Sequence, residues 1–159
     1  MARHFGIAGQ ESRFKINWTL MDAKYLLGIV EIDVQHSAIF AAIESLREIR
    51  TINEHPEMYR VLVGKLHDLL VDHFDFEELF MGSINCPERL EHIQRHLEIR
   101  NLLEDLANTP QTAMDGRLWQ ILDTALSEHL LKYDVTMGAT VEHLVAQVHR
   151  HESKARHRP

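Results

Sequence analysis

Histidine is the residue type that stands out in this chain, with twelve copies among 159 residues. Five of them and two carboxylates fall on apolar faces of expected helices: His36, His73, His92, His96, His129, Glu77 and Asp134. A single histidine on an apolar face is more often a core residue than a ligand. Five imidazoles with two carboxylates and no basic partner predict a bound cation, because an unpaired buried carboxylate costs several kcal/mol or takes up a proton.

The spacing of these residues favours two metal ions. His73 and Glu77 lie four residues apart, as do His92 and His96. Four residues of α-helix turn through ~400°, so each pair shares one face, about one turn apart, and can bind one centre. Seven protein ligands exceed what one first-row metal usually takes. Two metals that share two bridging carboxylates and divide five imidazoles would use all seven.

The last two candidate ligands do not fit a regular helix. His129 and Asp134 lie five residues apart, an offset of ~140° in an ideal α-helix, which would point them away from each other. We therefore expect either a π-type turn between them or a distorted helix end that brings Asp134 inward.

The ligand types limit the choice of metal. Imidazole with carboxylate suits iron, manganese or zinc, and these residues alone do not choose among the three. Cys86 is the single cysteine, so a disulfide within the chain, a Cys-rich zinc site and an iron–sulfur cluster are excluded. Ferritin-like di-iron bundles need Glu-x-x-His pairs, and no histidine in this chain follows a glutamate at that spacing.

Four amphipathic segments carry these residues, and the length suits one domain, so we expect an all-α fold. The first helix would start at Asp33 as N-cap and end before Asn53, and the second would run from Pro56 to about Gly82. The third would open at Pro87, and Thr112 with Asp115 resembles a capping box for the fourth. Short loops favour an up-down-up-down four-helix bundle over residues 33–136.

The predicted core consists of the apolar residues that share faces with the candidate ligands. In chain order these are Ile39, Phe40, Ile43, Leu46, Leu62, Leu66, Leu69, Leu70, Phe76, Phe80, Ile99, Leu103, Leu106, Leu118, Ile121, Leu122, Ala125 and Leu126.

Two further segments flank the predicted bundle. Residues 1–32 lack a clean helical period, but we expect an N-terminal arm along the bundle because four residues are apolar: Trp18, Tyr25, Leu26 and Ile29. Beyond Gly138, apolar residues at helical spacing predict an additional helix over 139–152, followed by a basic tail: Val141, Leu144, Val145 and Val148. That helix would pack on its own bundle or contact a protein partner or a second copy of the chain.

Charge and hydropathy exclude several classes of partner. The formal net charge of −7 repels nucleic acids and anionic lipid surfaces, so neither is expected as a partner. No apolar run reaches the ~20 residues that a membrane-spanning helix needs. The first 18 residues contain no signal-peptide hydrophobic segment, so we expect the protein in the cytoplasm.

The order of the seven candidate ligands, His36, His73-x-x-x-Glu77, His92-x-x-x-His96 and His129-x-x-x-x-Asp134, resembles the hemerythrin family, specifically the bacterial single-domain hemerythrins. Flanking residue types also match the family: Trp18, Gly28, Ile29, Asp33, Gln35, Phe74, Glu78, Met81 and Pro87. The resemblance covers roughly residues 15–136 and fills every ligand position in order, which is far more specific than a short motif.

This resemblance implies a centre of two non-haem iron ions with an oxo or hydroxo bridge. His92, His96 and His129 would fill one iron, and the other iron would keep an open position for dioxygen, or for small anions when oxidised. The other iron would be held by His36 and His73, and Glu77 and Asp134 would bridge the two. Four residues are expected to line the ligand pocket: Leu126, Phe40, Phe76 and Leu130.

Three functions remain open at this point. The first is reversible dioxygen binding for carriage, storage or delivery, which is not an enzymatic role. The second is a di-iron enzyme that reduces peroxide or nitric oxide. It would be favoured if Ala125, where the family commonly has tryptophan, enlarges the pocket. The third is an oxygen or redox sensor that acts through a separate partner.

Overall fold

Every regular element in the described part of the chain is helical. The computed structural model describes residues 25–52 and 56–156. The first three helices are α1 (Val30–Ile52), α2 (Pro56–Ser83) and α3 (Arg89–Ala107). The all-α prediction is confirmed for these residues. None of the described helices combines the length and the apolar content that a membrane crossing requires.

The fourth helical segment is continuous from Gln111 to Arg156. It contains α4 (Gln111–Ile121), two π-helical stretches, η2 (Leu122–Leu126) and η3 (His129–Asp134), and then α5 (Val135–Arg156). The predicted helix over 139–152 is present within α5, but α5 begins at Val135 and continues the fourth helical segment, so the predicted boundary at Gly138 is wrong. Gly138 does not break it, and a Cβ there would lie 3.3 Å from Leu27 Cδ2, so the glycine lets the incoming chain pack closely.

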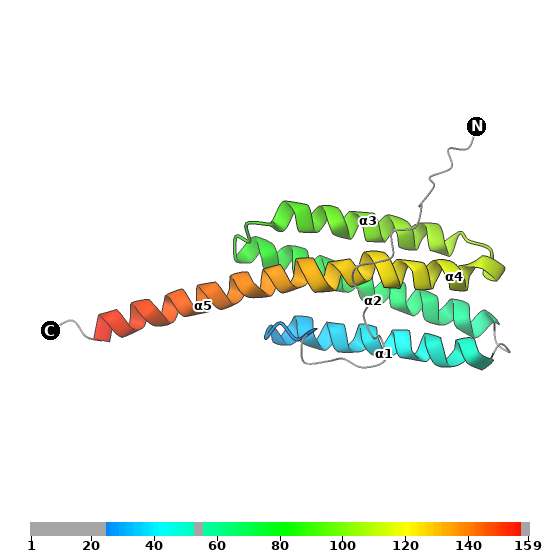
Figure 1. Cartoon of the computed structure of the whole chain (residues 1–159), viewed down its shortest axis with the longest axis horizontal. Coiled ribbons are helices and arrows are strands. Elements are labelled where there is room, and N and C mark those ends of the chain that lie inside the picture. The colour runs from blue at the N-terminus through cyan, green and yellow to red at the C-terminus, as the bar shows by residue number, and fades with distance from the viewer. Residues whose placement is uncertain (1–24, 53–55, 157–159) are drawn as a thin grey trace, which may run out of the picture.

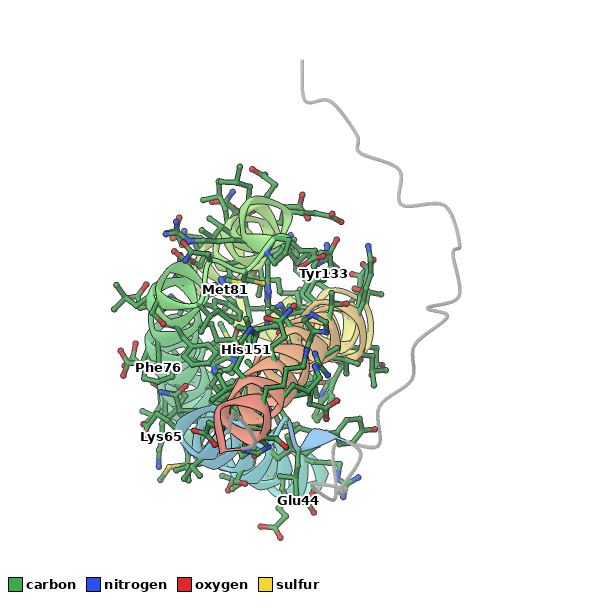
Figure 2. The ribbon with its side chains drawn as sticks, turned by 90° about the vertical axis from the view of Figure 1, so that its left-hand side faces the viewer. Glu44, Lys65, Phe76, Met81, Tyr133 and His151 are labelled. Atoms are coloured by element: carbon green, nitrogen blue, oxygen red, sulfur yellow. The ribbon has the colours of Figure 1, made fainter. Side chains whose placement is uncertain are left out.

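The helices lie side by side, and consecutive helices run in opposite directions, as the colour gradient in Figure 1 shows. Contacts join α1 to α2, α2 to α3, and α3 to α4. Figure 2, which looks along the long axis, shows the helices around a common interior. The outer part of α5 projects beyond the ends of α1, α2 and α3 (Figure 1).

The interior has two apolar clusters. The larger cluster runs along most of the helices and includes Ile39, Leu70, Ile99 and Leu130. The smaller cluster lies at the end from which α5 projects and is formed by Ile32, Met81, Cys86 and Met137. Along each of α1, α2 and the fourth helical segment, the predicted ligands fall between a residue of one cluster and a residue of the other. The polar layer is thus enclosed by apolar side chains on both sides.

Three helix starts differ from the predicted ones. The third helix was predicted to open at Pro87, but α3 begins at Arg89. Asp33 lies inside the first turn of α1, where its carboxylate accepts hydrogen bonds from the backbone N–H groups of Leu27 (2.7 Å) and Gly28 (3.0 Å). It therefore fastens the incoming chain instead of capping the helix. Thr112 is not the N-cap of the fourth helix, because α4 already begins at Gln111, and Asp115 accepts hydrogen bonds from Tyr59 (2.7 Å) and Trp119 (2.8 Å).

The buried face of α2 is rotated slightly from the predicted one. Fully buried positions include Val63, Phe74 and Met81, which were not predicted. Four residues expected in the core are only partly buried at its edge: Leu62, Leu69, Phe76 and Phe80. Spacing alone shows that α2 is amphipathic, but the neighbouring helices decide which residues lie at the centre of the face.

The N-terminal arm falls largely outside the described residues, since Trp18 and the rest of 1–24 are not part of them. Within the described part, Tyr25 is buried, with its ring centroid 5.5 Å from that of Phe40. Leu26 is half exposed, and Ile29 packs against the smaller cluster.

Candidate metal centre

All seven predicted ligands are buried, each with at most 2% of its surface exposed. Their ligand atoms form two overlapping groups, and within each group the atoms lie within 4.8 Å of one another. The three-histidine group contains His92, His96, His129 and Glu77, and the two-histidine group contains His36, His73, Glu77 and Asp134. Residues separated by almost one hundred positions in the sequence thus meet in one layer.

Glu77 contributes one carboxylate oxygen to each group. Its Oε1 lies 3.6 Å from Nε2 of His73. Its Oε2 lies 3.2 Å from Nε2 of His96 and 3.6 Å from Nε2 of both His92 and His129. The carboxylate therefore spans the space between the two groups.

Asp134 is divided between the groups in the same way. Its Oδ1 lies 3.1 Å from Nε2 of His92 and 3.0 Å from Nε2 of His129, while its Oδ2 lies 3.4 Å from Nε2 of His36. Both carboxylates thus have the arrangement that two bridging ligands need.

The π-helix η3 brings His129 and Asp134 to the same side of the fourth helical segment. It begins at His129 and ends at Asp134, so the prediction of a π-type turn between them is confirmed. A π-turn closes with i to i+5 hydrogen bonds and places residues five apart above one another. A regular α-helix over these six residues would turn one of the two side chains out of the site.

The second π-helix, η2, was not predicted. Its irregular backbone is supported by side chains. The Ser127 hydroxyl donates to the Leu122 carbonyl (2.8 Å), and Arg95 Nη2 on α3 donates to the Ala125 carbonyl (3.1 Å). Arg95 Nη2 also pairs with Glu128 at 2.7 Å, directly before His129. Arg95 therefore connects the helix that carries His92 and His96 to the segment that carries His129.

The site contains an unusual concentration of buried polar atoms without hydrogen-bond partners. Both carboxylate oxygens of Glu77 and of Asp134 are among them, as is Nε2 of four histidines: His36, His92, His96 and His129. Buried polar groups are nearly always paired in native proteins, and each unpaired one costs about 1–3 kcal/mol. Metal ions would satisfy these atoms together, so the residues present fit a dinuclear metal centre.

Burial dominates the electrostatics of the ligands. It lowers the pKa of His73 and of His96 to about 3, and that of His129 well below its usual value. These three imidazoles are therefore neutral at ordinary pH, which is the form that binds metals. Burial and the nearby Asp134 raise the pKa of Glu77 well above its usual value. For Asp134, burial raises the pKa, but the surrounding histidines lower it further, so the net shift is well downward.

Two of the candidate ligands have a hydrogen-bond partner at their other ring nitrogen. His73 Nδ1 donates to Gln35 Oε1 (3.0 Å), and His96 Nδ1 donates to Glu78 Oε1 (3.0 Å). A proton on Nδ1 leaves a lone pair on Nε2, the atom that faces the carboxylates. Gln35 and Glu78 were noted in the sequence only as flanking types, because their roles depend on contacts between different helices.

A small cavity adjoins the two-histidine group. Its volume is about 10 Å³, roughly the room for one water-sized molecule. Its lining consists of His36, Ile39, Phe40, Leu70, His73, Leu126, His129, Leu130 and Asp134. Phe40, Leu126 and Leu130 were predicted there, whereas Ile39 and Leu70 were missed.

The prediction that Phe76 lines this cavity is wrong. Phe76 stacks on Phe80 with ring centroids 6.4 Å apart and packs against the smaller apolar cluster. Figure 2 labels it at the outer side of α2. Ala125 does not line the cavity either. It is buried in the larger cluster, and its carbonyl accepts a hydrogen bond from Arg95. The absence of a larger side chain at Ala125 therefore does not open this cavity.

The other described histidines lie outside the site. His67, His143 and His151 make local contacts with neighbours on their own helices, and His149 is exposed near the end of α5. His55 and His157 are outside the described residues. Burial raises the pKa of the Cys86 thiol, which suits an unreactive side chain.

No protein-family model, curated protein or solved structure matches this chain.

Proposed function

We propose that this protein is hemerythrin-like: an up-down-up-down four-helix bundle that holds two non-haem iron ions and binds dioxygen reversibly. The observation that carries the proposal is the division of Glu77 and Asp134, each of which directs one oxygen toward the three-histidine group and one toward the two-histidine group. An oxo or hydroxo group would complete the bridge between the irons.

The choice of iron rests on the donor set and on the function. Five imidazoles and two carboxylates without a thiolate suit iron, manganese or zinc. Two ferrous ions supply the two electrons that dioxygen accepts on binding, which zinc cannot do. The resemblance in ligand order to the hemerythrins supports iron as well.

The protein's own residues determine where dioxygen would enter. One side of the centre has three histidines and the other has two, so the second side retains a free coordination position. The small cavity borders His36 and His73 of that side and is otherwise lined mainly by aliphatic and aromatic side chains. Such a lining excludes water and reductants, which favours reversible binding over turnover. Small anions would use the same position in the oxidised protein.

A sensor function is the second candidate, and the continuity of the fourth helical segment favours it. The π-helix η3 carries His129 and Asp134, and it continues without a break into α5. Val145 and Val148, in the C-terminal half of α5, are exposed. A shift of Asp134 on ligand binding would therefore reach a surface that a protein partner or a second copy could cover over residues 139–152.

The distinguishing experiment follows the optical spectrum of the reduced, iron-loaded protein as oxygen is added and then removed. We expect an oxygen-dependent band that appears and disappears over repeated cycles, with slow autoxidation over hours. Oxidation within seconds and no recovery would contradict a carrier. That result would indicate a di-iron enzyme acting on peroxide or nitric oxide, or a redox sensor. Cytoplasmic location and the absence of nucleic-acid and membrane partners remain predictions.

A further inference from the structure

The two halves of the metal centre have different supporting residues. On the three-histidine side, the acceptor for a ligand's Nδ1–H is the carboxylate of Glu78. On the two-histidine side, the corresponding acceptor is the neutral amide oxygen of Gln35. Both distances are 3.0 Å, so the difference between the sides lies in the charge of the acceptor.

We propose that Glu78 and Gln35 make the two metal positions unequal, so that the three-histidine position binds its metal first and more tightly. This inference rests on the dinuclear centre of the proposed function. It goes beyond it by naming the positioning residues that set the loading order and by predicting which iron favours the ferric state.

The carboxylate of Glu78 belongs to a wider network that keeps a net negative charge. Arg100 Nη1 donates to Glu78 Oε1 at 3.0 Å, and Arg100 Nη2 donates to Asp75 Oδ1 at 2.6 Å. One guanidinium is thus shared between two carboxylates, so the formal charge of the three groups is −1, and Glu78 is the member of the network that contacts His96. Phe74 stacks on the His96 ring with centroids 4.3 Å apart and restricts its orientation.

A negative acceptor strengthens an imidazole as a metal ligand. As His96 binds a cation through Nε2, its Nδ1–H becomes more acidic and its hydrogen bond to a carboxylate becomes stronger. Gln35 fixes the orientation of His73, but its amide oxygen is neutral and does not strengthen His73 as a ligand in this way. The same effect stabilises a higher metal charge, so the ferric state is favoured on the three-histidine side. Reactive ferrous iron is then retained on the side that adjoins the cavity.

The experiment is a titration of the metal-free protein with Co²⁺, followed by its visible absorption, so that neither oxygen nor iron is involved. We expect two binding steps of different affinity in the unaltered chain. Glu78→Gln keeps the size and a hydrogen-bond acceptor but removes the charge, and should weaken the tighter step about tenfold or more. Gln35→Glu should tighten the weaker step. A gain in affinity is a result that simple damage to the fold cannot produce.

Glu104→Gln is the matched control, because Glu104 is an exposed carboxylate on the same helix as His96, about two turns further along it. Both affinities should be unchanged in this variant. Two results would overturn the proposed difference between the metal positions while leaving the dinuclear centre intact, provided that the unaltered chain binds two Co²⁺ ions. One is that Glu78→Gln weakens both binding steps equally, and the other is that Gln35→Glu has no effect. If the unaltered chain binds only one Co²⁺ ion, both proposals fail.

Discussion

At the scale of single residues, the two bridging carboxylates have the largest energetic role. Glu77 and Asp134 are fully buried, and no described side chain satisfies their oxygens with a hydrogen bond. Without a cation, the raised pKa of Glu77 means that this site takes up a proton instead of bearing two negative charges. With two cations bound, both carboxylates would be ionised and each could bridge the two metal positions.

Replacement of Glu77 should therefore remove dinuclear binding. We expect Glu77→Ala to bind at most one metal ion per chain, because both metal positions lose an oxygen ligand. His67→Ala is the control, since His67 lies on the same helix outside the ligand groups and forms a hydrogen bond with Asp68. Metal content measured on purified protein checks the prediction. Equal metal loss in both variants would mean that the ligands are wrongly identified.

The cavity beside the two-histidine group gives a second prediction. Leu126→Ala should enlarge it and admit water, so autoxidation and azide binding should both become faster. Leu103→Ala is the matched control, because Leu103 is equally buried in the larger cluster but does not line this cavity. Each change costs about 2–5 kcal/mol of stability. Comparable rates in the two variants would show that stability, and not the cavity, governs ligand access.

The seven candidate ligands could be predicted from the sequence because they are polar residues at positions where the helical period requires apolar ones. The residues that hydrogen-bond to these ligands could not be predicted. Gln35 and His73, which form a hydrogen bond, are 38 residues apart in the sequence, and Glu78 and His96 are 18 residues apart. These contacts depend on how neighbouring helices are rotated, which periodicity does not determine. The same limitation explains why Phe76 was wrongly included in the cavity.

At the scale of elements, the fourth helical segment departs most from regular α-helix, because it contains both π-helical stretches. The five-residue spacing from His129 to Asp134 predicted the π-turn of η3, because no regular helix fits it. Nothing comparable marks η2 in the sequence, since its three buried apolar residues and its exposed Asp123 and Thr124 fit an ordinary amphipathic helix. Gly138 suggested a helix boundary, but it serves close packing against Leu27 within one long helix.

Arg95 should be important for the geometry of this segment. Arg95→Ala leaves the buried Ala125 carbonyl without its donor, which costs about 1–3 kcal/mol, and frees the chain before His129. We expect a lower melting temperature and weaker metal binding. Arg47→Ala, which removes a partly exposed pair with Glu44, should cost at most about 1 kcal/mol and leave the metal affinity unchanged. Unchanged metal affinity in Arg95→Ala would contradict this role.

At the scale of the whole molecule, the buried histidines make the metal-free protein sensitive to acid. In the unfolded chain, histidines take up protons below pH ~6.5. In the folded chain His73, His96 and His129 remain neutral, because their pKa values are about 3 or well below the usual value. The metal-free protein therefore loses unfolding free energy as the pH falls below ~6.5, toward the lower pKa values of the folded histidines.

Glu77 has the opposite effect, because its raised pKa lets the folded state keep a proton that the unfolded state releases above its usual pKa. The stability lost through the three histidines is larger than the stability gained through one carboxyl group. We therefore expect the metal-free protein to lose about 3 kcal/mol of unfolding free energy between pH 6.5 and 5. Urea denaturation at several pH values checks this, and a stability that is flat or rises on acidification would contradict the buried neutral site.

The central claim is that one chain holds two iron ions, and elemental analysis of protein produced in iron-replete medium tests it most directly. Seven buried ligands in two overlapping groups predict two irons per chain. A value of one metal per chain, or zinc as the only metal found, would contradict the account.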